Sequence, residues 1–139
     1  MIKRVYVDTS VVGGKFDKEF TLLTTPFWNA VFNRKMTIIV SDILEKELEG
    51  APIQIYEFFT QLPESQIEHV VSTDESDNLA KKYIAEYVVG RSSENDCKHI
   101  ALATINHADC LVSWNFKHIV NINRIRGYNG VNMLLAIQP

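Results

Sequence analysis

The residues KRVYVD at positions 3–8 give the first indication of the fold. They combine β-branched and aromatic side chains and end in an acid, which predicts a buried strand. Three further short apolar runs predict strands of the same kind, and they are TIIV at 37–40, IEHVV at 67–71 and CLVS at 110–113. The segments between these strands decide how the strands are arranged.

Those segments carry apolar side chains at helical spacing. We expect helices over five ranges, which are 19–34, 42–50, about 53–62, about 74–88 and about 94–108. Ser41 is placed to cap the second of these helices, and Pro52 to open the third. Pro26 lies inside the first range, so we expect it to kink or restart that helix. Short helical pieces are expected after the last strand.

Strands that alternate with helices are typical of an α/β protein with a parallel sheet. We therefore expect a three-layer α/β/α sandwich around a central parallel sheet of four or five strands. The 139 residues suit a single domain over 1–139, which is long enough to bury one core. In open sheets of this kind, functional sites lie outside the carboxyl ends of the strands.

The composition excludes several classes of protein. Hydrophobic residues make up 46% and charged residues 22%, which is typical of a globular chain and excludes disorder. No apolar run approaches the roughly 18 residues that a membrane span needs, and the N-terminus has no apolar signal-peptide core. The two cysteines, Cys97 and Cys110, lack the spacing of a zinc site and indicate reduced thiols in a cytoplasmic protein.

The net charge of -3 excludes a uniformly basic nucleic-acid binder. The charge is uneven, however, because residues 91–139 carry five Lys/Arg and three acids. A local basic face in the last third of the chain could hold the phosphates of a nucleic acid. The candidate residues are Arg91, Lys117, His118, Arg124 and Arg126. Ordinary surface charge is the competing interpretation for each of them.

Polar side chains follow the predicted strands at the edge where sites are expected. Asp8 ends the first strand, Glu47 lies two turns into the helix after the second, and Asp96 begins the helix before the last. Ser113 ends the last strand and Asn115 follows it. Crowded carboxylates repel one another, and a hard divalent cation with oxygen ligands, Mg²⁺ or Mn²⁺, would neutralise them. Such an ion can activate water and stabilise charge on a phosphate.

Four stretches of the chain resemble the four motifs of the PIN-domain family, in the same order and spacing. They are VDTS at 7–10, SDILEKEL at 41–48, ENDCKHIALAT at 94–104 and LVSWNFKHI at 111–119. The similarity is greatest to small bacterial toxins of the VapC type. It implies a Mg²⁺- or Mn²⁺-dependent endoribonuclease that cleaves single-stranded RNA. It further implies a homodimer that is inhibited by a small antitoxin protein.

The resemblance also implies roles for individual residues. By position, Asp8, Glu47 and Asp96 are the metal ligands, and Ser10 and Ser113 are hydroxyls that support the site. Asn115 stands where the family commonly has a fourth aspartate. An amide keeps one oxygen ligand but carries no charge, so a second metal ion should be held more weakly than the first.

Other interpretations of the same residues stay open. Asp8 could cap a helix, Glu47 could be solvated like its neighbours, and His99 is better explained as a buried packing histidine than as a ligand. Trp114 and Phe116 could stack on bases, although core burial is the simpler role. The whole chain could be a PIN-like module that binds RNA or protein without cleavage. A phosphoacceptor domain is the least favoured interpretation. Such a domain needs a second acid in the loop after the first strand and a lysine after the last strand, and this sequence has neither in a clear position.

Overall fold

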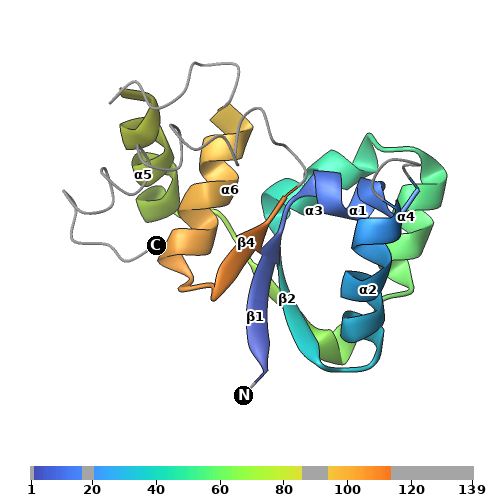
Figure 1. Cartoon of the computed structure of the whole chain (residues 1–139). Coiled ribbons are helices and arrows are strands. Elements are labelled where there is room, and N and C mark those ends of the chain that lie inside the picture. The colour runs from blue at the N-terminus through green and yellow to red at the C-terminus, as the bar shows by residue number, and fades with distance from the viewer. Residues whose placement is uncertain (1, 17–20, 86–93, 114–139) are drawn as a thin grey trace.

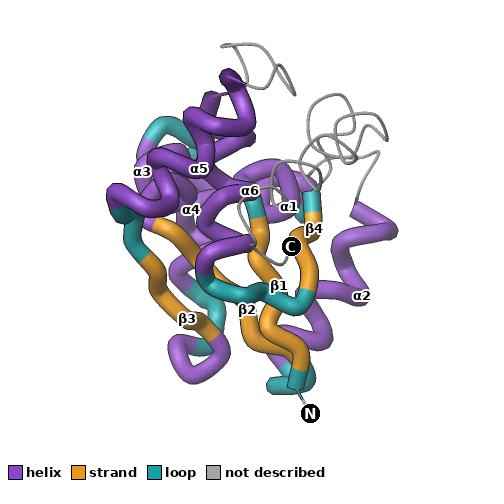
Figure 2. The backbone as a smooth tube through the Cα atoms, turned by 90° about the vertical axis from the view of Figure 1, so that its left-hand side faces the viewer, coloured by secondary structure: helices purple, strands orange, loops and turns teal. Residues whose placement is uncertain are grey.

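The four predicted strands form one parallel sheet. The computed structural model describes residues 2–16, 21–85 and 94–113. Within them the strands are β1 Lys3–Val7, β2 Met36–Ser41, β3 Ile67–Val70 and β4 Cys110–Val112. Their order in the sheet is β3-β2-β1-β4 (Figure 2). Every neighbouring pair is parallel. The α/β class and the parallel sheet predicted from the sequence are therefore confirmed.

Helices connect successive strands. They are α1 Thr9–Gly14, α2 Thr21–Phe32, α3 Asp42–Glu49, α4 Ile53–Thr60, the short 3-10 helix η1 Glu64–Gln66, α5 Asp74–Ala85 and α6 Glu94–Ile105. The five expected helices are present, whereas α1 and η1 were not predicted. Pro26 lies inside α2, and the helix continues through it to Phe32. Of the two effects expected of Pro26, a kink or a restart, the restart is excluded because the helix is continuous.

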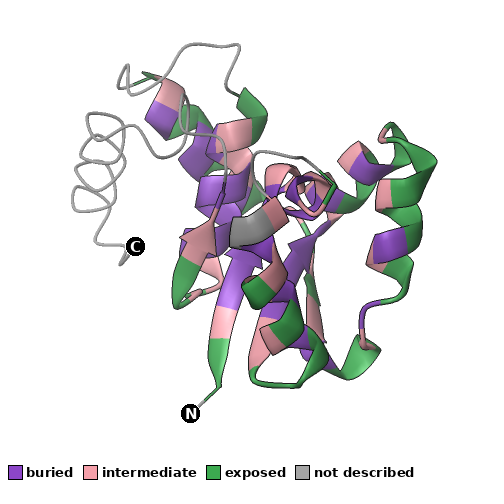
Figure 3. Cartoon of the chain, turned by 45° about the vertical axis from the view of Figure 1, so that its right-hand side comes forward, coloured by how far each residue is buried: buried purple, intermediate pink, exposed green. Residues whose placement is uncertain are grey.

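The two faces of the sheet carry different layers of helices, as the alternation along β1 illustrates. Val5 and Val7 join the core formed with α1, α2, α3 and α4. Tyr6, between them, points to the other face, where it packs with Leu102 of α6. Helix α5 then packs on α6 (Figure 1). The architecture is a three-layer α/β/α sandwich with its most buried residues around the central strands (Figure 3).

The strand order reverses direction between β1 and β4. From β1 the chain moves to β2 and then β3 on one side, and α5 and α6 carry it back across the sheet to β4 on the other side of β1. In parallel sheets such a reversal opens a crevice at the carboxyl ends of the two strands, where ligands bind. A ligand site is therefore expected at the end of β1 beside the end of β4.

The described helices and the two cysteines bear on the expectations about membrane spans and thiols. Among residues 2–16, 21–85 and 94–113, no helix is long and apolar enough to cross a membrane. Both cysteines are free, Cys97 buried in α6 and Cys110 exposed at the start of β4.

Candidate metal centre

Asp8 lies at the reversal point and is enclosed by hydroxyl groups. The register of β1 and β4 pairs Val7 with Val112, so the next residues of the two strands, Asp8 and Ser113, are neighbours. The Ser113 hydroxyl donates to Asp8 Oδ2 at 2.7 Å, and the Ser10 hydroxyl donates to Oδ1 at 2.6 Å. The backbone N–H of Val11 also donates to Oδ1 at 3.3 Å. Asp8 is therefore the N-cap of α1 as well as a strand-end carboxylate.

The burial of Asp8 makes this arrangement unusual. Only 4% of the residue is exposed, and its bonded partners are two hydroxyls and one amide, all neutral. No ion pair found in the described part of the chain involves it. A buried carboxylate is costly unless its charge is compensated, so a cation bound beside Asp8 would stabilise the protein.

Glu47 approaches the same edge from α3. Its neighbours Leu44 and Leu48 are buried, whereas Glu45 and Glu49 are exposed and Glu47 itself is partly buried, so Glu47 is not solvated like Glu45 and Glu49. His99 Nε2 of α6 lies 2.6 Å from Glu47 Oε1. Because an ionised carboxylate can only accept hydrogen bonds, Nε2 is the donor.

The environment of Glu47 favours its ionised form. Burial by itself would raise the pKa of this carboxyl, but the hydrogen bond and charge of His99 outweigh burial and lower the pKa. The Thr9 hydroxyl lowers it further, although Thr9 Oγ1 is buried and makes no hydrogen bond of regular geometry to a described residue. Glu47 is therefore a carboxylate at neutral pH. The nearby Thr9 hydroxyl oxygen still has capacity to accept a hydrogen bond or to bind a cation.

Tyr6 of β1 connects His99, the partner of Glu47, to the start of α3. Its hydroxyl donates to Ser41 Oγ at 2.8 Å and lies 2.7 Å from His99 Nδ1. Burial raises the pKa of Tyr6, and the nearby charges of Asp8 and Glu47 raise it further, so the hydroxyl stays neutral. The prediction that His99 is a satisfied, buried histidine is confirmed.

Asp96 lies in the first turn of α6, half-buried, one helical turn before His99. Residues three apart on a helix share a face, so Asp96 lies on the side of α6 that carries the contact to Glu47. In the described ranges no group of three or more His, Cys, Asp or Glu side chains is arranged so that it could hold a metal ion. The convergence of Asp8, Glu47 and Asp96 on one ion therefore stays a prediction.

The chemistry of these donors fits a hard divalent cation. The groups at the edge are carboxylates and hydroxyls, the oxygen ligands that Mg²⁺ and Mn²⁺ prefer. The hydrogen-bond partners of Asp8 among the described residues are uncharged. Thr9 Oγ1 is buried and makes no hydrogen bond of regular geometry to a described residue. Asp8, Glu47 and Asp96 are accordingly the residues that would hold such an ion, with Ser10 and Ser113 supporting Asp8.

The remaining predicted site residues lie outside the described residues. They are Asn115, Arg91, Lys117, His118, Arg124 and Arg126, together with the aromatic residues Trp114 and Phe116. Their proposed contacts with a second metal ion or with RNA therefore remain predictions from the sequence.

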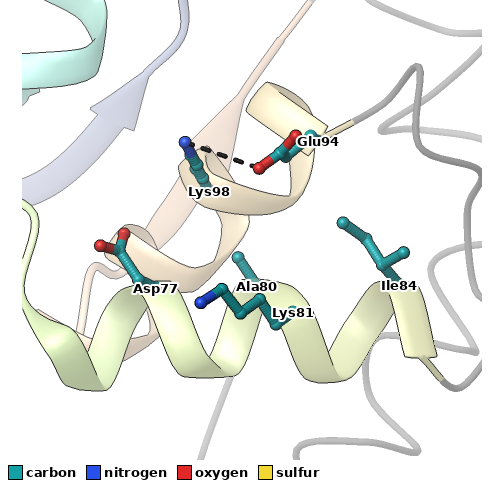
Figure 4. A pocket seen from close by; sticks show the side chains of 6 residues that line it. All are labelled: Asp77, Ala80, Lys81, Ile84, Glu94 and Lys98. Atoms are coloured by element: carbon teal, nitrogen blue, oxygen red, sulfur yellow. Dashed lines mark ion pairs between the residues drawn. The ribbon is translucent and has the colours of Figure 1, made fainter.

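A small cavity between α5 and α6 lies apart from this centre. It measures about 100 Å³ and is lined by Asp77, Ala80, Lys81, Ile84, Glu94 and Lys98 (Figure 4). Two lysines face two acids there, and Lys98 Nζ lies 3.8 Å from the Glu94 carboxylate. The cavity has no net charge that would attract a phosphate, so it does not extend the candidate metal centre.

The sequence predicted Asp8, Ser10, Ser113 and Glu47 as site residues but did not predict the contacts of Tyr6 with Ser41 and His99. The alternation of β1 indicates a buried Tyr6, and a buried tyrosine hydroxyl needs a polar partner. No sequence signal names that partner, because Tyr6 and His99 are 93 positions apart. Neither a comparison with protein-family models nor one with curated proteins found a match to this chain.

Proposed function

We propose that this protein is a Mg²⁺- or Mn²⁺-dependent endoribonuclease that hydrolyses phosphodiester bonds of single-stranded RNA. The observation that carries the proposal is the buried Asp8 carboxylate, which accepts hydrogen bonds from Ser10 and Ser113 where the strand order reverses. Glu47 reaches the same edge as a second carboxylate. The resemblance of four sequence stretches to the PIN-domain family supplies the reaction class.

Each residue has a role in this proposal. Asp8, Glu47 and Asp96 hold the ion, directly or through water, and Asn115 and Ser10 complete its surroundings. The bound ion supplies an activated water and stabilises the charge that develops on the phosphate. Ser10 and Ser113 fix the orientation of Asp8 so that its carboxylate does not have to rearrange during the reaction. Basic residues such as Lys117 and Arg124 hold the flanking phosphates.

The test is cleavage of an end-labelled single-stranded RNA in Mn²⁺. The wild-type protein should cleave slowly, and Asp8→Asn or a chelator should abolish cleavage. Asn115 lowers the expected rate, because it removes one charge from the family pattern. Activity that survives both the chelator and Asp8→Asn would overturn the proposal.

A matched control is Glu49→Gln, which removes an exposed acid from the same helix as Glu47. We expect this variant to cleave like the wild type. The amide that Asp8→Asn introduces keeps an oxygen that can accept from Val11, so the cap of α1 should survive the change. Melting temperatures of the metal-free proteins separate a loss of the site from a loss of the fold.

Asn115 favours one alternative, a PIN-like module that binds RNA or protein without cleaving. RNA binding in Mn²⁺ without any cleavage would support that alternative over the nuclease. In either case RNA affinity should fall with added salt, because phosphate contacts release counterions.

The cellular role is proposed from the resemblance alone. We propose that the protein is a cytoplasmic toxin, a homodimer, and the target of a small antitoxin protein. Light scattering of the purified protein tests the dimer, and growth arrest on expression of the wild type but not of Asp8→Asn tests the toxic role.

A further inference from the structure

His99 is a buried residue that contacts Glu47 at the candidate metal centre. Only 2% of this residue is exposed, and both of its ring nitrogens have close polar neighbours. Nε2 lies 2.6 Å from Glu47 Oε1, and Nδ1 lies 2.7 Å from the Tyr6 hydroxyl. Tyr6 in turn donates to Ser41 Oγ, which also caps α3. These contacts form a continuous series from Ser41, the cap of α3, through Tyr6 and His99 to the Glu47 carboxylate.

The ring of His99 is fixed in orientation as well as in position. It meets the Tyr6 ring edge-on, with centroids 5.7 Å apart and planes at 63°. Tyr6 is fully buried in β1, so it provides a rigid support. Glu47 is the only member of the group that reaches solvent, with 31% of its side chain exposed. The contacts of His99 with Tyr6 and Glu47 therefore fix the orientation of the partly exposed Glu47 carboxylate.

We propose that His99, oriented by Tyr6, is a positioning residue that holds Glu47 for cation binding. The contact occupies Oε1 and leaves the other carboxylate oxygen of Glu47 for the ion. This inference rests on the proposed function, because it takes Glu47 as a ligand. Hydrogen bonds to a ligating carboxylate commonly fix its orientation, and their loss typically lowers metal affinity 10–100-fold.

His99 acts through Glu47 and does not act on the substrate. With 2% of the residue exposed and both nitrogens engaged, it has no path to an RNA phosphate or to a reacting water. A purely structural role predicts a different result from a positioning role. Loss of a structural residue changes the stability of the metal-free protein, whereas loss of a positioning residue changes the affinity for the ion.

Two substitutions of His99 separate these roles. In His99→Gln the side-chain amide reaches the position of Nε2 and can still donate to Glu47. In His99→Asn the shorter amide lies near the position of Nδ1, so it can reach Tyr6 but not Glu47. Calorimetric titration with Mn²⁺ should show affinity about 10–100-fold weaker for His99→Asn. His99→Gln should stay within a few-fold of the wild type.

Tyr6→Phe gives an independent test that keeps His99 in place. It removes the hydroxyl that orients the imidazole, and we expect Mn²⁺ affinity to fall several-fold. If both His99 variants fail to fold, this variant decides the question. Melting temperatures without metal are measured for every variant, so that affinity is compared only between folded proteins.

The outcomes distinguish the positioning role from the proposed function. Mn²⁺ binding that is lost in Asp8→Asn but unchanged in His99→Asn would overturn the positioning role and leave the nuclease standing. Equal weakening in His99→Gln and His99→Asn would likewise overturn it. A wild-type protein that neither binds Mn²⁺ nor cleaves RNA would overturn both.

Discussion

The carboxylate of Asp8 serves two purposes at once. It accepts the N–H of Val11 and so caps α1, and it lies buried between the Ser10 and Ser113 hydroxyls. A neutral asparagine could perform the cap equally well. Retaining a buried charge there costs stability in the metal-free protein, which is common at functional sites. A bound cation would compensate the buried charge of Asp8, which a neutral asparagine would lack.

Asn115 is the residue at which the sequence departs from the four-acid pattern. Two metal ions roughly 4 Å apart repel each other, and anionic ligands must offset that repulsion. We predict that Asn115→Asp tightens Mn²⁺ binding to the free protein and raises RNA cleavage at low metal concentration. The metal-free protein should become less thermally stable, because a fourth anion adds repulsion.

Calorimetric titration of Mn²⁺ into the wild type and Asn115→Asp, with melting curves in chelator, measures both effects. Unchanged affinity and stoichiometry would mean that Asn115 lies outside the surroundings of the metal ion.

At the scale of the elements, the start of α3 connects the fold to the site. Ser41 Oγ accepts the backbone N–H of Leu44 and the hydroxyl of Tyr6, so one side chain caps the helix and supports the Tyr6–His99 contact. Helix α5 has a cap of its own, in which Thr73 and Ser76 exchange side-chain and backbone hydrogen bonds. Among the described residues, the side-chain hydrogen bonds of this second cap join Thr73 and Ser76 to each other.

We predict that Ser41→Ala and Thr73→Ala each destabilise the protein by about 1 kcal/mol, the usual cost of an N-cap. Only Ser41→Ala should also weaken Mn²⁺ binding, because only Ser41 touches Tyr6. Urea unfolding and calorimetry of the two variants make the comparison. Equal Mn²⁺ affinity in both variants would show that the Ser41 cap does not influence metal binding.

The elements show why sequence reasoning succeeded in most places and failed in a few. Strands and long helices have repeating patterns, and their expected ranges lie within a few residues of those found. Helix α1 has six residues, TSVVGG, whose valines and glycines are poor helix formers, so it carries no helical signal. It forms because Asp8 caps it and Val11 and Val12 are buried. Pro26 is tolerated inside α2, where tertiary packing outweighs the local preference.

The candidate site was predictable only in part, for a related reason. Asp8 and Ser113 follow strands, and parallel strands must end at one edge, so their proximity follows from the topology. The contact of Glu47 with His99 depends on how α3 and α6 are turned toward each other. The sequence separation of 52 residues carries no information on that rotation.

At the scale of the whole molecule, Arg4 connects several elements at the edge of the sheet opposite the candidate site. The Arg4 guanidinium near the start of β1 forms two hydrogen bonds with the Glu68 carboxylate of β3, at 2.7 and 2.9 Å. The same guanidinium donates to the carbonyls of Asn106 and His107, after α6. Arg4 therefore ties both edges of the sheet to its centre.

We predict that Glu68→Gln lowers the free energy of unfolding at pH 7 by about 0.2–1 kcal/mol, as for other partly exposed ion pairs. The hydrogen bond from Arg4 lowers the pKa of Glu68 in the folded state. The stabilisation is therefore complete above the unfolded pKa of about 4.3 and is lost as the pH falls through the lower folded value.

Urea unfolding from pH 7 to pH 3 checks this prediction. The difference between Glu68→Gln and the wild type should disappear at the acid end, and Mn²⁺ affinity at pH 7 should be the same in both. A difference that grows on acidification would contradict the assigned sign.

The central claim is that the edge of the sheet at Asp8 holds a divalent cation. The most direct test is anomalous diffraction from crystals of the protein soaked in Mn²⁺. We predict one strong peak between Asp8 and Asp96, within reach of Glu47. A peak only at the exposed His69, where Glu45 and Glu64 flank the imidazole, or no peak at Asp8 at saturating Mn²⁺, would contradict the claim.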